Sequence, residues 1–130
     1  MRALVTGAAK RLGKEIAIFL AERGFEVAIH YHSSEKSADE LVNYIKSKIG
    51  KNSVALRADL TKEKEVQTLI SRANENLGGP INCLINNASI FETIGRPLVA
   101  NVLEGYNGTL MGIISRNTNR IQHFWTDFIR

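Results

Sequence analysis

The residues with the clearest chemical meaning form a glycine-bearing loop near the N-terminus, Thr-Gly-Ala-Ala-Lys-Arg-Leu-Gly at residues 6–13. Apolar residues 3–5 before the loop are typical of a buried strand, and apolar residues at helical spacing follow it. Such a loop directs the free amide groups and the positive dipole end of the helix at whatever lies above the strand. An anionic pyrophosphate fits that field, and Gly7 and Gly13 permit the tight turn and the close approach of helix and strand. We therefore predict a phosphate-binding loop.

Polar residues follow three further strand-like segments, at the point where each segment ends. Together with the apolar Leu60 and Ala88 between or beside them, the candidate residues are His30, Tyr31, His32, Ser33 and Ser34 after the second segment, Asp59 and Leu60 after the third, and Asn86, Asn87, Ala88 and Ser89 after the fourth. Ligands of open parallel sheets bind beyond the carboxyl ends of the strands. We therefore expect these residues to surround the same ligand as the loop.

The elements that must position these residues alternate regularly. Four apolar segments, at residues 3–5, 27–31, 54–56 and 83–85, are separated by three helical patterns. The first helix ends at Gly24, the second begins with a capping box of Ser37 and Glu40, and the third runs from Thr61 to residue 77. Each unit spans the roughly 30 residues of a βαβ crossover. This predicts one α/β domain over residues 1–130, a Rossmann-like doubly wound parallel sheet truncated after about four strands.

Composition excludes several other classes of protein. The net charge is +4, but the basic residues have acidic neighbours and form no polycationic strip, so we expect no nucleic-acid partner. Cys83 is the only cysteine, which rules out an internal disulfide and indicates a core thiol. The N-terminus reaches Thr6 and Gly7 before a signal-peptide core can form, and no apolar run approaches the roughly 20 residues of a membrane span. We therefore expect a cytoplasmic protein without a membrane partner.

In combination these motifs resemble the short-chain dehydrogenase/reductase family, whose loop is Thr-Gly-x-x-x-Gly-x-Gly and whose fourth strand ends in Asn-Asn-Ala-Gly. The departures from that pattern are similar to the pteridine reductase group. They are Arg11 in place of the middle glycine, His30-Tyr31-His32-Ser33 after the second strand, Ser89 in place of the last glycine, and the aromatic Phe91. The resemblance covers residues 2–91, that is, the N-terminal cofactor-binding half of the family. It fades from Glu92 onward, where residues 92–130 diverge and end in an apolar helical pattern.

The residues favour NADP(H) as the cofactor. No carboxylate follows the second strand before Glu35, whereas Lys10, Arg11 and His32 can complement a 2′-phosphate. The alternative is that Lys10 and Arg11 are solvated cations at a helix start. His30 and His32 share one strand face, but because they lack a third ligand at suitable spacing we predict no metal.

The resemblance implies the remaining site roles. The whole cofactor set comprises Gly7, Lys10, Arg11, Leu12, Gly13, His30, Tyr31, His32, Ser33, Ser34, Asp59, Leu60, Asn86, Asn87, Ala88 and Ser89. In it, Asp59 accepts from the adenine amino group, and Asn86 and Asn87 fix the fourth strand to its neighbours and reach the ribose. The alternatives are that Asp59 helps to cap the third helix, which is compatible with adenine binding, and that Asn86 and Asn87 form a plain turn. Arg11, Ser89 and Phe91 belong to a substrate site for a small molecule, either a pterin-like ring or another carbonyl or unsaturated ring.

The catalytic residues of the family are not matched. Hydride transfer there uses a Tyr-x-x-x-Lys pair, a serine and an asparagine, and the one Tyr-x-x-x-Lys here, Tyr44 with Lys48, falls on the second helix. We assign no catalytic residue and expect the 130 residues alone to show weak or no turnover. The alternative is a non-catalytic nucleotide-binding or interaction protein. If the sheet ends at its fourth strand, the unpaired edge also predicts self-association into a homo-oligomer.

Overall fold

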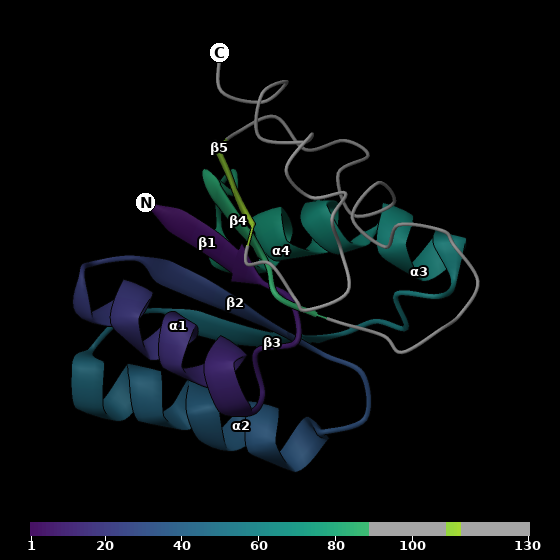
Figure 1. Ribbon diagram of the computed structural model, residues 1–130. Coiled ribbons are helices and arrows are strands. Elements are labelled where there is room, and N and C mark those ends of the chain that lie inside the picture. Colours follow the sequence, from purple (N-terminus) through teal and green to yellow (C-terminus); the bar gives the residue numbers. More distant parts are fainter. Residues whose placement is uncertain (89–108, 113–130) are drawn as a thin grey trace.

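The computed structural model describes residues 1–88 and 109–112. Its centre is a five-stranded sheet (Figure 1). Its strand order is β3-β2-β1-β4-β5, and each neighbouring pair is parallel. The strands are β1 Arg2–Val5, β2 Glu26–Tyr31, β3 Ser53–Arg57, β4 Cys83–Asn86 and β5 Thr109–Gly112. The order reverses direction between β1 and β4, which is the place where doubly wound sheets bind their ligands. The predicted Rossmann-like α/β fold is confirmed.

Helices cover both faces of the sheet (Figure 1). They are α1 Arg11–Glu22, α2 Glu35–Tyr44, α3 Glu63–Gln67 and α4 Leu69–Leu77, with the π-helical turn η1 Ile45–Ile49 after α2. Because alternate residues of a strand point to opposite faces, the strands divide the core into two clusters. Leu4 and Leu84 pack in the cluster that contains α4, whereas Val5, Ile29 and Ile85 pack in the cluster that contains α1 and α2. Each large apolar side chain buried in this way contributes about 1.5–3 kcal/mol.

Cys83 lies in β4 as a free, buried thiol, as predicted. Burial raises its pKa, which keeps the thiol protonated and unreactive at neutral pH. Each helix in the described residues is too short or too polar to cross a lipid bilayer.

Two predicted helix boundaries are wrong. The second helix begins at Glu35 after an N-cap at Ser34, so Ser37 lies inside it and forms no capping box with Glu40. The carbonyl oxygen of Ser34 already accepts from the Ala38 amide at 3.0 Å, which starts the helix one turn earlier. The predicted helix from Thr61 to residue 77 is two helices, α3 and α4, which meet at Thr68. Apolar periodicity continues through this junction and therefore did not reveal it.

The expectation of an unpaired edge at the fourth strand is also wrong. The backbone of β5 pairs with β4 from Cys83↔Thr109 to Asn86↔Gly112. This strand has only four residues and ends in a glycine, and it falls at the start of the stretch after residue 108 that was predicted as an apolar helical tail. Its presence removes the reason given for self-association. The rest of the predicted helical tail, like Ser89 and Phe91, lies outside the described residues.

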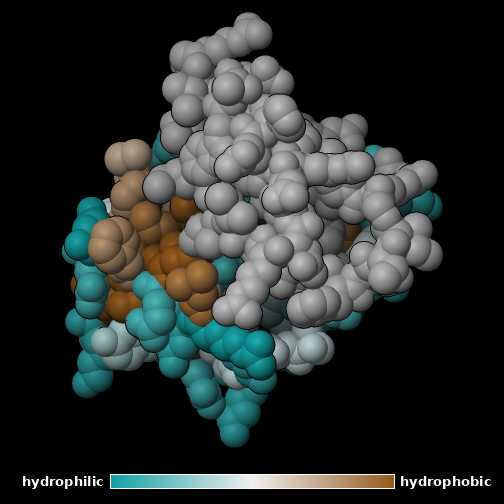
Figure 2. All heavy atoms as spheres, viewed as in Figure 1, coloured by the Kyte–Doolittle hydropathy of each residue, from teal (hydrophilic) through white to brown (hydrophobic). Residues whose placement is uncertain are grey.

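The helix α1 leaves large apolar side chains on the surface. Leu12 and Phe19 are 54% and 50% exposed. Figure 2 shows an apolar area over the part of the molecule where β1 and α1 lie. The Arg23 guanidinium covers the Phe19 ring at 3.2 Å from its centroid, so a cation–π contact shields one of these side chains.

Candidate functional site

The hydroxyl of Thr6 joins the loop after β1 to the segment after β4. Thr6 is completely buried, and its Oγ1 accepts hydrogen bonds from the backbone amides of Asn87 and Ala88, each at 3.0 Å. The same oxygen lies 3.3 Å from Asn86 Oδ1, to which it donates. With two acceptor positions and one donor position, the hydroxyl is fully used. Thr6 therefore fixes the ends of both strands and has no group left for a ligand.

Asn87 ties the same two segments together through its side chain. Its Nδ2 donates to the carbonyl oxygens of Thr6 and Gly7, both at 3.1 Å. A side-chain carbon at Gly13 would overlap the Gly7 carbonyl oxygen and lie 2.5 Å from Asn87 Nδ2. The start of α1 therefore lies against the loop because residue 13 is glycine, as the spacing predicted.

The start of α1 carries the features of an anion site. Its N-cap, Lys10, is extended and makes no side-chain capping hydrogen bond. Gly7 and Arg11 have left-handed φ values of 62° and 55°, which turn the chain into the helix. Lys10, Arg11 and Leu12 are exposed around this helix end. Uncapped amides and the helix dipole attract an anion here, and the two cations strengthen the attraction.

Replacing Arg11 by glycine is expected to stabilise the protein. A left-handed φ costs an ordinary residue about 1–2 kcal/mol, and glycine avoids this cost although it loses more backbone entropy on folding. The expected result is a free energy of unfolding about 0.5–1 kcal/mol higher, measured by urea denaturation. Lys10→Gly is the matched control because residue 10 is extended, with φ of −143°, so that variant gains nothing. Equal destabilisation of both variants would contradict the strain at Arg11.

His30 holds the loop from the neighbouring strand. Its Nδ1 accepts from the Gly7 amide at 2.9 Å, and its Nε2 lies 2.8 Å from the Ala58 carbonyl oxygen. Burial lowers the pKa of His30, and the nearby charges of His32 and Arg72 act in the same direction. A neutral imidazole that accepts at Nδ1 carries its proton on Nε2 and donates it to Ala58.

The predicted residues around the end of β2 divide into two groups. His30 and Tyr31 are buried, with Tyr31 in the core cluster beside α2, where burial raises its pKa. His32 and Ser33 are exposed and Ser34 is half-buried, so these residues are open to a ligand. The expectation that His30 and His32 share a strand face is wrong because β2 ends at Tyr31. The described residues contain no group of three or more potential metal ligands.

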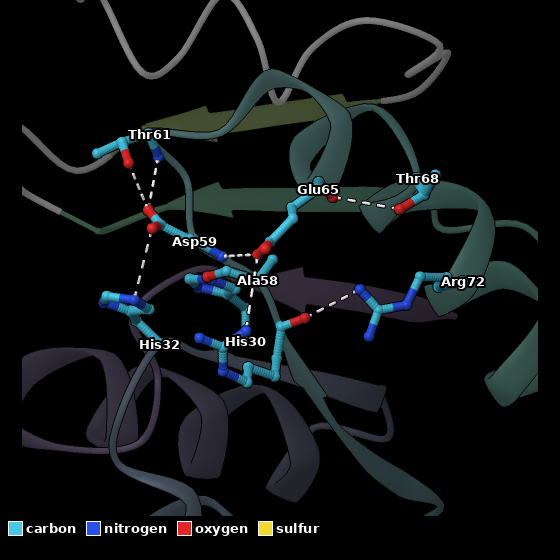
Figure 3. Close-up of polar contacts among 9 residues, drawn as sticks. His30, His32, Ala58, Asp59, Thr61, Glu65, Thr68 and Arg72 are labelled. Atoms are coloured by element: carbon cyan, nitrogen blue, oxygen red, sulfur yellow. Dashed lines mark hydrogen bonds and ion pairs between the residues drawn. The ribbon is translucent and has the colours of Figure 1, made fainter.

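Asp59, just after β3, organises a polar turn (Figure 3). Its Oδ1 accepts from the Thr61 amide at 3.0 Å and from the Thr61 hydroxyl at 2.6 Å. These hydrogen bonds are the main reason that its pKa is lowered, so the carboxylate is ionised at neutral pH. Its Oδ2 lies 3.7 Å from His32 Nε2. Asp59 thus forms a turn with Thr61, whereas the N-cap of α3 is Lys62, so the predicted capping role is wrong. The second carboxylate oxygen of Asp59 faces the exposed residues after β2.

Leu60 and Glu65 complete this turn. The Leu60 side chain is buried, so only its backbone can face a ligand. Glu65 Oε2 accepts from the Asp59 amide at 2.5 Å and lies 3.8 Å from an Arg57 nitrogen. Glu65 therefore holds the Asp59 backbone in place, a role that the sequence analysis missed.

The structure brings the described site residues to one edge of the sheet, where β1 to β4 end. Tyr44 and Lys48 lie elsewhere. Asn52 follows the same helical segment, and its carbonyl oxygen accepts a hydrogen bond from the Val27 amide at 3.2 Å, at the start of β2. The C-terminal end of this segment therefore lies at the opposite, amino edge of the sheet. Their position supports the interpretation that their Tyr-x-x-x-Lys spacing is coincidental.

Comparisons with known proteins identify the family of this chain. A family model described as short chain dehydrogenase matches residues 1–118. The match extends past Phe91, into the segment where the resemblance fades. Hydroxynaphthalene reductase-like protein Arp2 of Metarhizium guizhouense is 47% identical over 76 residues, which are 58% of this chain and 28% of that protein.

Solved structures with the same fold contain a bound nucleotide. FolM alternative dihydrofolate reductase 1 from Brucella suis, in complex with NADP, is 42% identical with a TM-score of 0.64, over 70% of this chain and 37% of that chain. The corresponding protein from Brucella canis, complexed with NADP, is 32% identical with a TM-score of 0.70, over 87% and 55% of the two chains. This chain therefore spans between 28% and 55% of the length of these relatives.

Proposed function

The chain belongs to the short-chain dehydrogenase family, and on that premise we propose that the carboxyl edge of β1, β2, β3 and β4 binds NADP(H). The observation that carries the proposal is the uncapped start of α1, set against the loop by Gly13 and flanked by exposed Lys10 and Arg11. Such a helix end binds a pyrophosphate through its backbone amides. The NADP in the Brucella relatives supports the same cofactor here.

The distribution of charge favours NADP(H) over NAD(H). The exposed segment after β2 carries His32, Ser33 and Ser34 and no carboxylate before Glu35. A carboxylate in this segment would accept from the ribose hydroxyls of NAD and repel a 2′-phosphate. Asp59 follows β3 and is not part of this segment; its Oδ1 is engaged by Thr61, and its Oδ2 lies 3.7 Å from His32 Nε2. Lys10, Arg11 and His32 are therefore the groups we assign to the 2′-phosphate.

We further propose that the protein is an oxidoreductase of the pteridine-reductase type. NADPH supplies a hydride when bound, and Arg11, Ser89 and Phe91 are the residues assigned to a pterin-like substrate. The names of the Brucella relatives, which include dihydrofolate reductase, support a substrate with a pterin ring. A cytoplasmic location stays a prediction. Self-association also stays untested, without the support of an unpaired fourth strand.

The test is cofactor binding by the 130-residue chain. Calorimetric titrations with NADPH and with NADH are expected to give a dissociation constant at least tenfold lower for NADPH. This factor corresponds to about 1.4 kcal/mol of binding free energy. Lys10→Gln is expected to reduce this preference, and Lys51→Gln, on an exposed lysine before β3, serves as the control for a general loss of charge. Equal affinity for the two cofactors would contradict the assignment of the 2′-phosphate, and no binding of either would contradict the function.

A second function, nucleotide binding without catalysis, is favoured by one observation. The only Tyr-x-x-x-Lys pair in the sequence, Tyr44 with Lys48, lies on a helical segment whose C-terminal end is at the edge of the sheet opposite the site. NADPH binding without oxidation of NADPH in the presence of dihydrobiopterin would support this function for the 130 residues. Measurable reduction of dihydrobiopterin would exclude it.

A further inference from the structure

We propose that His30 is a positioning residue that couples the phosphate-binding loop to the end of β3, and that its protonation weakens NADP(H) binding at acid pH. The inference rests on the proposed NADP(H) binding. It differs from the expected role of His30, which was to contact the cofactor directly. The described geometry instead commits every polar atom of the imidazole to the protein.

Residue 30 holds two successive amides of the loop. The His30 ring accepts from the Gly7 amide at 2.9 Å, and the His30 carbonyl oxygen accepts from the Ala8 amide at 3.0 Å. These bonds orient the chain just before the residues that lead into α1. The direction of the loop amides therefore depends on whether His30 can accept at Nδ1.

The same ring reaches the other side of the site. Its Nε2 donates to the Ala58 carbonyl oxygen at 2.8 Å, and Ala58 precedes Asp59. The Ala58 amide in turn donates to the Tyr31 carbonyl oxygen at 3.0 Å. His30 is thus a bridge between the loop after β1 and the polar turn after β3. Figure 3 shows His30 beside Ala58, at the start of that turn.

Protonation would break this bridge at one end. An imidazolium has a proton on both nitrogens, so Nδ1 would then present a donor to the Gly7 N–H, and the two donors would repel each other. His30 is only 2% exposed, so water does not readily replace the lost acceptor. The Gly7 amide would have to turn away, and the loop that we assign to the pyrophosphate would turn with it.

The charged groups around His30 are few and mostly engaged. His32 beyond β2 and Arg72 on α4 oppose its protonation, as does burial, while the Ala58 carbonyl favours it. Arg72 also donates to the Arg57 carbonyl oxygen at 2.9 Å. The carboxylates of the same region, Asp59 and Glu65, are held by Thr61 and by the Asp59 amide.

The direction of the pH effect follows from the lowered pKa of His30. His30 is neutral and the loop is held at neutral pH, and protonation sets in only below its folded pKa, which is under 6.5. If the cofactor-bound form retains the neutral ring, the dissociation constant for NADPH rises about tenfold per pH unit below that pKa. The free energy of unfolding also falls as the pH falls, because His30 takes up its proton in the unfolded state near pH 6.5 and in the folded state only at lower pH.

The experiment measures the NADPH dissociation constant from pH 5 to pH 8 in the 130-residue chain and three variants. His30→Asn places an amide oxygen where Nδ1 accepts but cannot be protonated, so its affinity is expected to lose the steep acid limb. His30→Gln, whose longer amide can donate to Ala58, tests the other end of the bridge. His32→Gln is the matched control, since it removes the neighbouring exposed histidine and leaves the contacts of His30 intact; it is expected to bind more weakly but keep the acid limb.

An acid limb of equal steepness in His30→Asn and in the wild type would overturn the proposal. A second measurement depends neither on cofactor binding nor on whether a variant folds. In the wild-type chain, the NMR shifts of the His30 ring nitrogens are expected to report the Nε2-protonated form, and the Gly7 amide shift to titrate together with His30. A Gly7 amide that does not respond would overturn the proposal, whereas a responding amide without NADPH binding would refute only the proposed function.

Discussion

Thr6→Val lowers the free energy of unfolding by about 2–4 kcal/mol, the largest effect that we expect from any single substitution in the site. Valine has nearly the shape of threonine but leaves the amides of Asn87 and Ala88 without their acceptor. Each buried amide that loses its partner costs about 1–3 kcal/mol, and partial access of water brings the sum toward the lower values. Urea denaturation followed by circular dichroism measures the change.

Thr6→Ser provides the control for this prediction. Serine keeps the hydroxyl and loses only a methyl group, so it is expected to cost less than about 1.5 kcal/mol. The two variants should also differ in NADPH binding, because the valine variant frees the segment after β4 from the loop. Equal stability of the two variants would show that the hydroxyl is not the link between these strands.

Gly13→Ala is expected to weaken NADPH binding at least tenfold and to destabilise the protein by about 1–3 kcal/mol. Alanine favours a helix over glycine by about 1 kcal/mol, so helix propensity alone predicts the opposite sign. The added carbon would overlap the Gly7 carbonyl oxygen and the Asn87 amide, and Asn87 is already held by two hydrogen bonds. Overpacking against groups that cannot move aside outweighs the gain in propensity.

Gly50→Ala is the control that separates an effect on stability from an effect on NADPH binding. Gly50 has a φ of 76° and open space around it, at the end of η1 and away from the loop. Alanine there costs about 1–2 kcal/mol through backbone strain. It should therefore lower stability and leave the affinity for NADPH unchanged. If Gly13→Ala does the same, the close approach at residue 13 is not needed for binding.

The sequence was sufficient to predict the strands and helices whose residues follow a simple periodic pattern. Apolar runs followed by helical spacing predicted β1 to β4 and α1, and the glycine spacing predicted the approach at Gly13. Those features depend on residues close together in the chain. The fifth strand was missed because four residues beside glycines carry little periodicity.

The contacts inside the site needed the structure. Thr6 was seen only as part of a motif, because the amides that it binds belong to residues 87 and 88. His30 and His32 look alike in the sequence, yet one is buried and the other exposed, because the strand ends between them. Whether a polar residue is buried or exposed here depends on where its strand ends, and strand ends are set by tertiary pairing.

The bond network at Thr6 also has a consequence for the order of folding. It connects residue 6 to amides 81 and 82 positions later, so the loop cannot take its final form until β4 has docked beside β1. Contacts of such long separation form late, because the chain must first close the intervening segment. During synthesis from the N-terminus, the loop emerges long before its partners. A nucleotide that binds the finished loop therefore selects chains that have completed the sheet, and stabilises them by mass action.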